Sequence, residues 1–336
     1  MIRWIALAAV AAGCAGDITG GDAPPTPPAP DAAAGEPAVT IASPAPGATV
    51  VRDALDPVGA LAAAVDVRVD VTGPVARVEV LAGGEPVGDG TAVTAWLRAD
   101  GPTTIRAVGF DAAGAEVAAD EIDIVVAAPE VADCAGWLDL YGLDYEPGPD
   151  RQGVDDPVTV TTPINGVAYR YVSNSDPRTT FFMHCELAHA LAKAAPILRE
   201  RGVVEVADIG VYNYRCIGGG TPPDCPNGIS QHAYAKAIDI AGFTTEDGTY
   251  YSVNDDWVID PDDEPTCAAA VENDKDAFLH EIVCAMKAAG VWNIALTPNY
   301  NDAHRNHFHV DLTEGSDFIR RQIGTRAGAN RAPLAD

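Results

Sequence analysis

Two short segments in the C-terminal half of the chain hold side chains that can bind a metal ion. The first is SQHAYAKAIDI, residues 230–240, and the second is HRNHFHVDL, residues 304–312. Together they contain four of the seven histidines, all of which follow residue 183. Two neutral imidazoles and one carboxylate are a common catalytic zinc set that leaves a coordination position for water. The candidate ligands are His232, Asp239 and one of the two histidines His307 and His309.

Alternation of polar and apolar residues predicts a β-strand in each segment. The second segment alternates His307, His309 and Asp311 with Phe308, Val310 and Leu312. Its two imidazoles therefore point the same way, about 7 Å apart along the strand. In the first segment Asp239 faces away from Ile238 and Ile240, which are expected to enter the core. His232 precedes this strand, in a loop or turn.

The other polar residues of this region have simpler interpretations. His184, His189 and His280 are each interpreted as a solvated side chain or as the partner of a carboxylate. Asp311 has two interpretations: it can accept a hydrogen bond that orients an imidazole, or it can be a surface carboxylate that ends the strand.

Two amphipathic segments predict helices that support these strands. One covers Cys185 to Ala195 and is interrupted by Pro196, and the other covers Asp274 to Ala289 and ends at Gly290. Combined with the strands, they predict an α+β domain in which an antiparallel sheet carries helices on one side.

The N-terminal residues 1–14, MIRWIALAAVAAGC, are typical of a signal peptide. The ending Ala12-Gly13-Cys14 resembles a bacterial lipobox, which implies cleavage before Cys14, acylation of its thiol and attachment to a membrane through lipid. An ordinary signal peptide with an incidental cysteine is the alternative. Residues 15–37 are rich in proline and alanine and are expected to form an extended tether.

Six cysteines remain after Cys14, at positions 134, 185, 216, 225, 267 and 284. An even number in an exported protein predicts three disulfides. Cys216 and Cys225 bracket a short Gly/Pro-rich loop and are expected to pair with each other, whereas the sequence does not decide how the other four pair. A cysteine zinc site is disfavoured because the chain has no Cys-X-X-Cys pair.

Residues 38–128 alternate in short runs that are separated by turn residues. Valines 65, 67, 69 and 71 alternate with Asp66, Arg68 and Asp70, which places the valines on one face of a sheet. About seven such runs predict a β-sandwich. The opening SPAPGATV resembles bacterial immunoglobulin-like modules found beside cell-envelope enzymes. A spacer or a weak binding module, including one for carbohydrate, is expected here.

Composition and charge exclude several classes of protein. At 336 residues the chain has room for about two domains. Its 21 basic and 49 acidic residues give a net charge of 21 − 49 = −28, which would repel nucleic acid. Its longest apolar run is shorter than the roughly 20 residues of a membrane-spanning helix, which excludes a polytopic membrane protein.

The metal-ligand segments resemble those of known metallopeptidases. Residues 230–239 match the Ser-X-His-X-X-Gly-X-Ala-X-Asp motif of D-Ala-D-Ala metallopeptidases, except that Ala235 replaces the glycine. If this turn requires a positive φ, the alanine is strained. The stretch 130–320 resembles the extensin-like C-terminal domain of bacterial proteins, through YNYRC, SQHAYAKAIDIAGF, EDGTYYSVNDDW and HRNHFHVDL. Residues 321–336 form a tail.

The resemblance implies a role for each site residue. Zinc ligands would be His232, Asp239 and His309, and His307 would act on the bound water or the tetrahedral intermediate. A second register, in which His307 binds zinc and His304 is the base, stays open. Arg215 resembles the arginine that steadies the substrate carbonyl in related peptidases.

The expected function is that of an exported, zinc-dependent hydrolase of the cell envelope. Its bond would be an amide in the peptide stems or cross-links of peptidoglycan, or in another cell-surface polymer. The expected location is the bacterial outer membrane or periplasm, with attachment through lipid. The alternative is a non-catalytic zinc-containing module that binds or strengthens the envelope.

Overall fold

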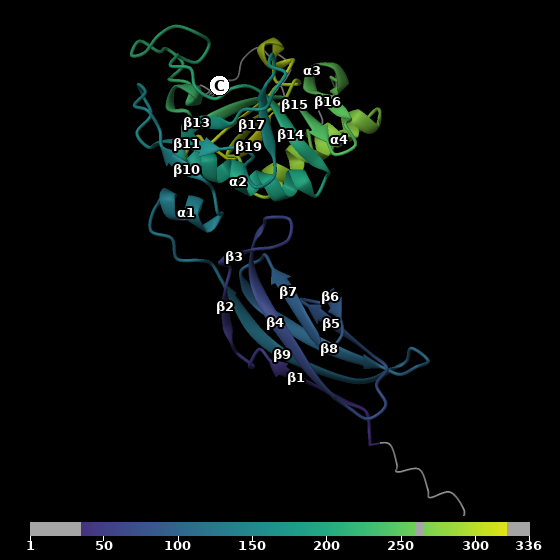
Figure 1. Ribbon diagram of the computed structural model, residues 1–336. Coiled ribbons are helices and arrows are strands. Elements are labelled where there is room, and N and C mark those ends of the chain that lie inside the picture. Colours follow the sequence, from purple (N-terminus) through teal and green to yellow (C-terminus); the bar gives the residue numbers. More distant parts are fainter. Residues whose placement is uncertain (1–34, 260–264, 321–336) are drawn as a thin grey trace, which may run out of the picture.

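The computed structural model describes residues 35–259 and 265–320 (Figure 1). The predicted signal peptide, Cys14, most of the predicted tether and the tail 321–336 lie outside the described residues. Two folded parts follow one another along the chain, and each has its own buried apolar cluster. No helix in the described ranges is both long and apolar enough to cross a membrane.

The first part is a sandwich of two β-sheets. One sheet has the order β1-β4-β3, with β7 also paired to β4, and the other has the order β2-β9-β8-β5-β6. The strands are β1 (Ala38–Ser43), β2 (Thr49–Val51), β3 (Ala54–Leu55), β4 (Leu61–Thr72), β5 (Arg77–Ala82), β6 (Glu85–Asp89), β7 (Ala92–Leu97), β8 (Gly101–Phe110) and β9 (Glu116–Ala127).

The valine pattern of β4 explains how the sandwich packs. Val65, Val67 and Val69 are at most 5% exposed, whereas the polar residues between them face solvent. The predicted alternation is therefore confirmed. Burying one face of each sheet against the other is the main source of stability for such a fold.

The second part is also mostly β, with a few helices. Its helices are α1 (Cys134–Leu140), α2 (Cys185–Arg199), α3 (Val253–Asp256) and α4 (Asp274–Ala288), and its 3-10 turns are η1 (Gln231–Tyr234) and η2 (Asp302–His304). Its strands are β10 (Tyr145–Pro147), β11 (Pro157–Thr161), β12 (Ala168–Tyr171), β13 (Thr180–His184), β14 (Val203–Gly210), β15 (Ala237–Thr245), β16 (Tyr250–Ser252), β17 (Ile294–Leu296), β18 (Phe308–Asp311) and β19 (Phe318–Arg320).

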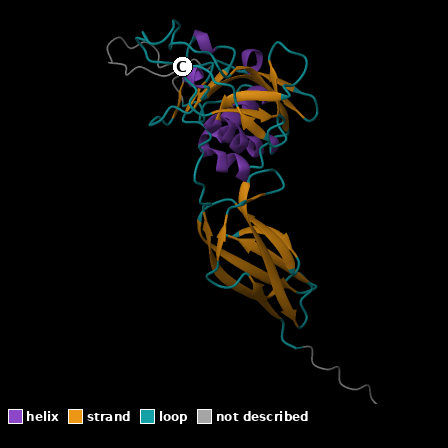
Figure 2. Cartoon of the chain, turned by 60° about the vertical axis from the view of Figure 1, so that its left-hand side comes forward, coloured by secondary structure: helices purple, strands orange, loops and turns teal. Residues whose placement is uncertain are grey.

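The main sheet of the second part has the order β12-β14-β15-β18-β17-β19, with β16 also paired to β15. The prediction of a purely antiparallel sheet is wrong. The sheet is mixed, because β12 runs parallel to β14 and β17 runs parallel to β19. Parallel neighbours need a long crossover connection, and α2 lies in the connection between β12 and β14. Figures 1 and 2 show α2 on the side of the sheet that faces the sandwich.

The two predicted long helices form, but one of them is longer than expected. α4 ends at Ala288, close to the predicted end, and Gly290 follows with a φ of 62°. α2 continues through Pro196 to Arg199, so the predicted break at Pro196 is wrong. Proline removes one helical hydrogen bond, but the last turn buries Leu198 at 2% exposure, and this packing keeps the turn helical.

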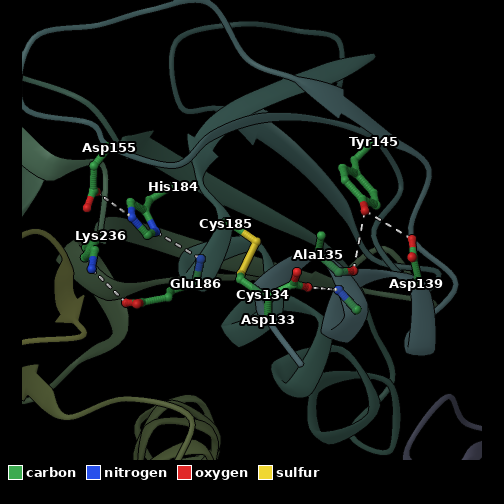
Figure 3. The surroundings of a disulfide bond; sticks show 11 residues. Asp133, Cys134, Ala135, Asp139, Tyr145, Asp155, His184, Cys185, Glu186 and Lys236 are labelled. Atoms are coloured by element: carbon green, nitrogen blue, oxygen red, sulfur yellow. Dashed lines mark hydrogen bonds and ion pairs between the residues drawn. A yellow bond between two sulfur atoms is a disulfide. The ribbon is translucent and has the colours of Figure 1, made fainter. Parts of the chain in front are cut away.

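The six cysteines of the second part form three disulfides. Cys216 pairs with Cys225, as predicted, and the remaining pairs are Cys134–Cys185 and Cys267–Cys284. Figure 3 shows Cys134–Cys185, which joins the start of α1 to the start of α2. The first of these helices is thereby fixed to the core of the second part.

The two parts meet where α2 ends. Arg98 of the sandwich bonds to both Asp56 and Glu200, at 2.6 and 2.7 Å. Arg199 donates to the backbone oxygen of Val58 at 2.9 Å. The loop 56–60 therefore provides a second link between the parts, besides the covalent connection at 128–133.

Candidate metal centre

His232 is positioned by a short turn that leads into the central strand β15. Ser230 caps η1 by accepting from the His232 backbone N–H. The turn ends at Ala235, whose φ of 53° and ψ of 31° are left-handed. Position 235, where the sequence motif quoted above has glycine, thus does adopt a positive φ, and Ala235 is strained, as the sequence predicts.

Strand pairing brings the other two candidate ligands together. β15 and β18 are antiparallel neighbours, and Asp239 lies directly opposite His309 in their register. Directly opposed residues have adjacent side chains on one face of the sheet. Pairing of these two strands thus brings Asp239 and His309, which are 70 residues apart in the sequence, into contact.

The three side chains converge on one point. Asp239 Oδ1 lies 3.1 Å from His232 Nε2 and 2.9 Å from His309 Nδ1, and the two nitrogens are 3.2 Å apart. His232 is 3% exposed and His309 is 1% exposed. Among the described residues, a second metal-like group contains Cys134 and Cys185, but these two sulfurs are joined in a disulfide.

Hydrogen bonds on the far side of each ring select the nitrogen that faces the cluster. His232 Nδ1 lies 2.9 Å from the Val211 carbonyl oxygen, which can only accept, so this nitrogen carries the proton. His309 Nε2 lies 3.0 Å from Asp311 Oδ2, and Asp311 is fully buried. His232 Nε2 and His309 Nδ1 can then present lone pairs to a metal ion. Asp311 therefore has the orienting position, not that of a surface carboxylate.

The electrostatics of the cluster favour a positive charge. Burial alone would lower the pKa of His309, but hydrogen bonds to Asp239 and Asp311 raise it to about 9. Burial likewise opposes ionisation of Asp239, yet its hydrogen bonds with His232 and His309 hold its pKa well below the usual range. One fully buried carboxylate, Asp311, and one partly buried carboxylate, Asp239, beside the same imidazole thus stabilise a cation at this place.

This donor set fits zinc. Zinc bonds of about 2.0–2.1 Å to nitrogen and oxygen place neighbouring ligand atoms of a tetrahedron roughly 3.3 Å apart. The three observed separations, 2.9 to 3.2 Å, are close to that value. The second hydrogen bond of each imidazole is the arrangement that metal-binding histidines need.

His307 and His304 lie beside this cluster rather than in it. His307 Nε2 is 3.5 Å from Asp239 Oδ1, and its side chain is 12% exposed. The His304 ring is 5.2 Å from that of His307, and its Nδ1 lies 2.6 Å from Asn301 Oδ1. Burial lowers the pKa of both imidazoles, to about 3 for His304.

A cleft of about 530 Å³ opens beside the cluster. His232, Asp239 and Arg215 line it, so the structure brings Arg215 to the site that the sequence assigned to it. The cleft is also lined by residues outside the two metal-ligand segments: Arg151, Tyr171, Arg178, Phe181, Phe182 and Tyr212. They lie up to 88 residues from Asp239, and no local pattern marks them.

The remaining three histidines lie outside the candidate metal centre and contact carboxylates or aromatic rings. His184 Nε2 pairs with Asp155 at 2.9 Å, as expected for the partner of a carboxylate (Figure 3). His280 is 3.6 Å from Asp276 and stacks on Trp257. His189 is an exception, because its ring stacks on Trp137 at 4.8 Å and its buried Nε2 has no hydrogen-bond partner within 35–259 and 265–320.

Fold and site together define a mostly β chain in which a few helices support a sheet with a buried histidine and carboxylate cluster. Residues 134–320 match the family described as extensin-like protein C-terminus, and the chain belongs to this family. The predicted resemblance to extensin-like domains is thereby confirmed. No curated protein is significantly similar to the chain.

Solved structures give weak likenesses only. The fibronectin(III)-like modules of Clostridium thermocellum CbhA are 17% identical, with a TM-score of 0.22, over 27% of this chain and 99% of that one. A Parabacteroides merdae beta-glucuronidase is 15% identical, with a TM-score of 0.21, over 37% of this chain and 15% of that one. Bacteroides ovatus SGBP-B is 9% identical, with a TM-score of 0.21, over 64% of this chain and 45% of that one.

Proposed function

We propose that the chain is a zinc-dependent peptidase that hydrolyses an amide bond in the peptide stems or cross-links of peptidoglycan. The observation that carries the proposal is the convergence of His232 Nε2, Asp239 Oδ1 and His309 Nδ1 at the edge of a cleft. The resemblance of residues 230–239 to the D-Ala-D-Ala metallopeptidase motif supports the reaction. A predicted signal peptide and three disulfides support a location outside the cytosol.

In this proposal His232, Asp239 and His309 hold the zinc ion. When bound, the ion would supply Lewis acidity that polarises the scissile carbonyl and lowers the pKa of water to about 7. The chain's own contribution is to fix the ligand geometry, because Val211 and Asp311 prevent both imidazoles from turning. The nearly complete burial of His232 and His309 excludes competing water from the ligand face.

His307 is the residue best placed to move the proton. Its Nε2 faces Asp239 without belonging to the ligand set, and Asn306 Oδ1 lies 2.8 Å from its Nδ1. It can take a proton from the attacking water and pass it to the departing amine. His304 is more buried and lies behind His307, so we assign it to supporting that ring.

Arg215 supplies a fixed positive charge where the substrate carbonyl would lie. It lines the cleft beside His232 and Asp239, and its side chain has no carboxylate partner among the described residues. A guanidinium in that position would stabilise the oxyanion that develops during attack on the amide.

The decisive test is to incubate the purified protein with isolated peptidoglycan, with added zinc and with a chelator, and to identify released products by mass spectrometry. We expect peptide products that disappear with the chelator, and their new amine and carboxyl ends will identify the bond. His309→Ala should lose both zinc retention and product release. Full activity in that variant would refute the assignment.

The same experiment separates the alternative, a zinc-containing module that binds the envelope without cleaving it. The alanine at position 235, where related peptidases have glycine, favours that alternative. A zinc-loaded protein that sediments with peptidoglycan and releases nothing would support it. The sandwich is proposed as a spacer in either case.

A further inference from the structure

The cleft beside the candidate metal centre is cationic although the chain is strongly acidic. Three arginines line it, Arg151, Arg178 and Arg215, whereas Asp239 is the one acidic residue among the described residues of its lining. Against 49 acidic and 21 basic residues in the whole chain, this concentration of positive charge is local. The three arginines differ in what neutralises them.

Arg178 is already neutralised by the protein. Its guanidinium lies 2.6 and 3.0 Å from the two carboxylate oxygens of Asp208, which is fully buried. Arg151, in contrast, has no ion pair with a carboxylate anywhere in the described ranges, and it is exposed. Its charge is therefore available to a ligand.

Aromatic rings hold the Arg151 guanidinium in place. Its central carbon lies 4.7 Å from the ring centre of Phe182 and 5.3 Å from that of Tyr212. These two rings contact each other edge to face at 5.8 Å. A guanidinium stacked on rings keeps its N–H groups free in its own plane, and a carboxylate can accept two of them at once.

The loop that carries Arg151 is docked firmly against the site. Gly153 has a φ of +87°, and a Cβ there would lie 2.6 Å from the carbonyl oxygen of Ala233, next to His232. Tyr212 donates its hydroxyl to the Gln152 carbonyl at 3.0 Å. Further along the loop, Asp155 pairs with His184 (Figure 3). This anchoring fixes Arg151 relative to the metal ligands.

We propose that Arg151 is the specificity residue of the cleft and binds a carboxylate of the peptide substrate. The inference rests on the proposed peptidase function and adds the substrate class: peptides that carry a free carboxylate near the scissile amide. The carboxylate can be a chain terminus or an acidic side chain. Phe182 and Tyr212 are positioning residues, because they hold the guanidinium and leave its edge open.

The test measures binding rather than cleavage, so it does not depend on turnover. Four peptides are titrated calorimetrically into the zinc-loaded full chain: acetyl-Ala-Glu-Ala, its C-terminal amide, acetyl-Ala-Gln-Ala and the amide of the last. We expect the peptide without a carboxylate to bind at least tenfold more weakly than the peptide with two. The two peptides with one carboxylate each show whether the protein binds the terminal or the side-chain carboxylate.

Arg151→Gln should remove that discrimination, and Arg151→Lys should keep part of it. Because the side chain is exposed, both variants should fold, which circular dichroism checks. Arg106→Gln is the matched control: it removes one charge from the sandwich, where Arg106 pairs with Glu116, and should bind like the wild type. Unchanged discrimination in Arg151→Gln, or a wild type that binds all four peptides equally or none, would overturn the proposal.

The outcomes also separate this proposal from the one on which it rests. Carboxylate binding through Arg151 without any product from peptidoglycan would refute the peptidase and leave the carboxylate site standing. If chelator-sensitive products appear and Arg151→Gln changes neither peptide binding nor KM, the peptidase stands and the carboxylate site at Arg151 is refuted. A rise in KM without a fall in kcat is the kinetic signature expected of this variant.

Discussion

At the scale of single residues, the candidate metal centre depends on a carboxylate that is not itself one of the candidate ligands. Asp311 is fully buried, accepts from His309 Nε2 and also accepts from the backbone N–H of Thr313 at 2.8 Å. It therefore fixes both the proton position and the orientation of the ring. Its neighbour on the same face, His309, offers the other nitrogen to the cluster.

We expect Asp311→Ala to weaken zinc binding by about 10- to 100-fold, because such orienting partners typically contribute that much. Asp311→Asn keeps an acceptor oxygen and should lose less. Competition with a chromophoric chelator measures both affinities. Equal zinc affinity in the wild type and in a folded Asp311→Ala variant would show that the ring is held by something else.

Ala235 tests whether the turn before β15 tolerates a side chain at positive φ. Ala235→Gly relieves the left-handed strain but removes a fully buried methyl group, and these effects, each about 1 kcal/mol, should nearly cancel. Ala235→Val should lose at least about 2 kcal/mol, because a β-branched residue is disfavoured at positive φ. Urea unfolding of the three proteins gives the comparison, and a valine variant as stable as wild type would contradict it.

Some site residues could be predicted from the sequence and others could not. His232, Asp239 and His309 belong to two local patterns, and strand alternation places Asp239 and His309 on polar faces. The same alternation put Asp311 on the face of His309 but could not tell an orienting residue from a surface one. Arg151 has no local pattern, because its partners come from β13 and from the segment after β14.

At the scale of elements, α2 is packed through a histidine that must stay neutral. His189 stacks on Trp137 and contacts the tilted ring of Tyr141, and burial lowers the pKa of its imidazole to about 4. Its ordinary value is 6.5, so between pH 6.5 and 4 the unfolded chain binds this proton more readily than the folded chain.

Stability should therefore fall as the pH drops through this window, by on the order of 2 kcal/mol from His189 after allowance for its partial exposure. His189→Phe keeps the stacking and cannot titrate, so its unfolding temperature should fall less between pH 6.5 and 4.5. Differential scanning calorimetry across that range makes the comparison. Parallel pH profiles for the two proteins would assign the acid sensitivity elsewhere.

β14 depends on a buried charge that the segment before β13 neutralises. Asp208 is fully buried and held by the two hydrogen bonds from Arg178, and burial raises the pKa of its carboxyl group. Arg178→Met would leave this carboxylate without a partner, which typically costs about 3–5 kcal/mol. Chemical denaturation measures the loss, and Arg178→Met with Asp208→Leu should recover much of it.

Element positions were predicted better than element connections. The apolar periods identified α2, α4 and the strands that carry the site, because burial is repeated along each element. The end of α2 was misplaced because the packing of Leu198, a tertiary effect, outweighs the local preference of Pro196. The parallel pairing of β12 with β14 depends on the path of the chain, which periodicity does not encode.

At the scale of the whole molecule, the two parts have largely separate cores and meet through a few polar contacts and the packing of Leu61. The side chains of Arg98 and Glu200 are 46% and 37% exposed, so their ion pair is largely screened by solvent. Glu200→Gln should therefore lower the stability of either part by less than about 1 kcal/mol, because it removes this pair and leaves Arg98 bound to the buried carboxylate of Asp56. Calorimetry of the full chain, with and without the substitution, checks this, and a loss of several kcal/mol would show that the parts fold as one unit.

The length of strand β4 sets the distance between the second part and the opposite end of the sandwich. Leu61, at the start of β4, packs into the core of the second part, and Thr72, at its end, pairs with Ala38 at the start of β1. Twelve residues at about 3.3 Å each span roughly 40 Å. The described chain therefore begins at the end of the sandwich that lies away from the second part (Figure 1). If the segment before Ala38 is fastened to a surface, the sandwich holds the second part, and with it the cleft, about this far from that surface.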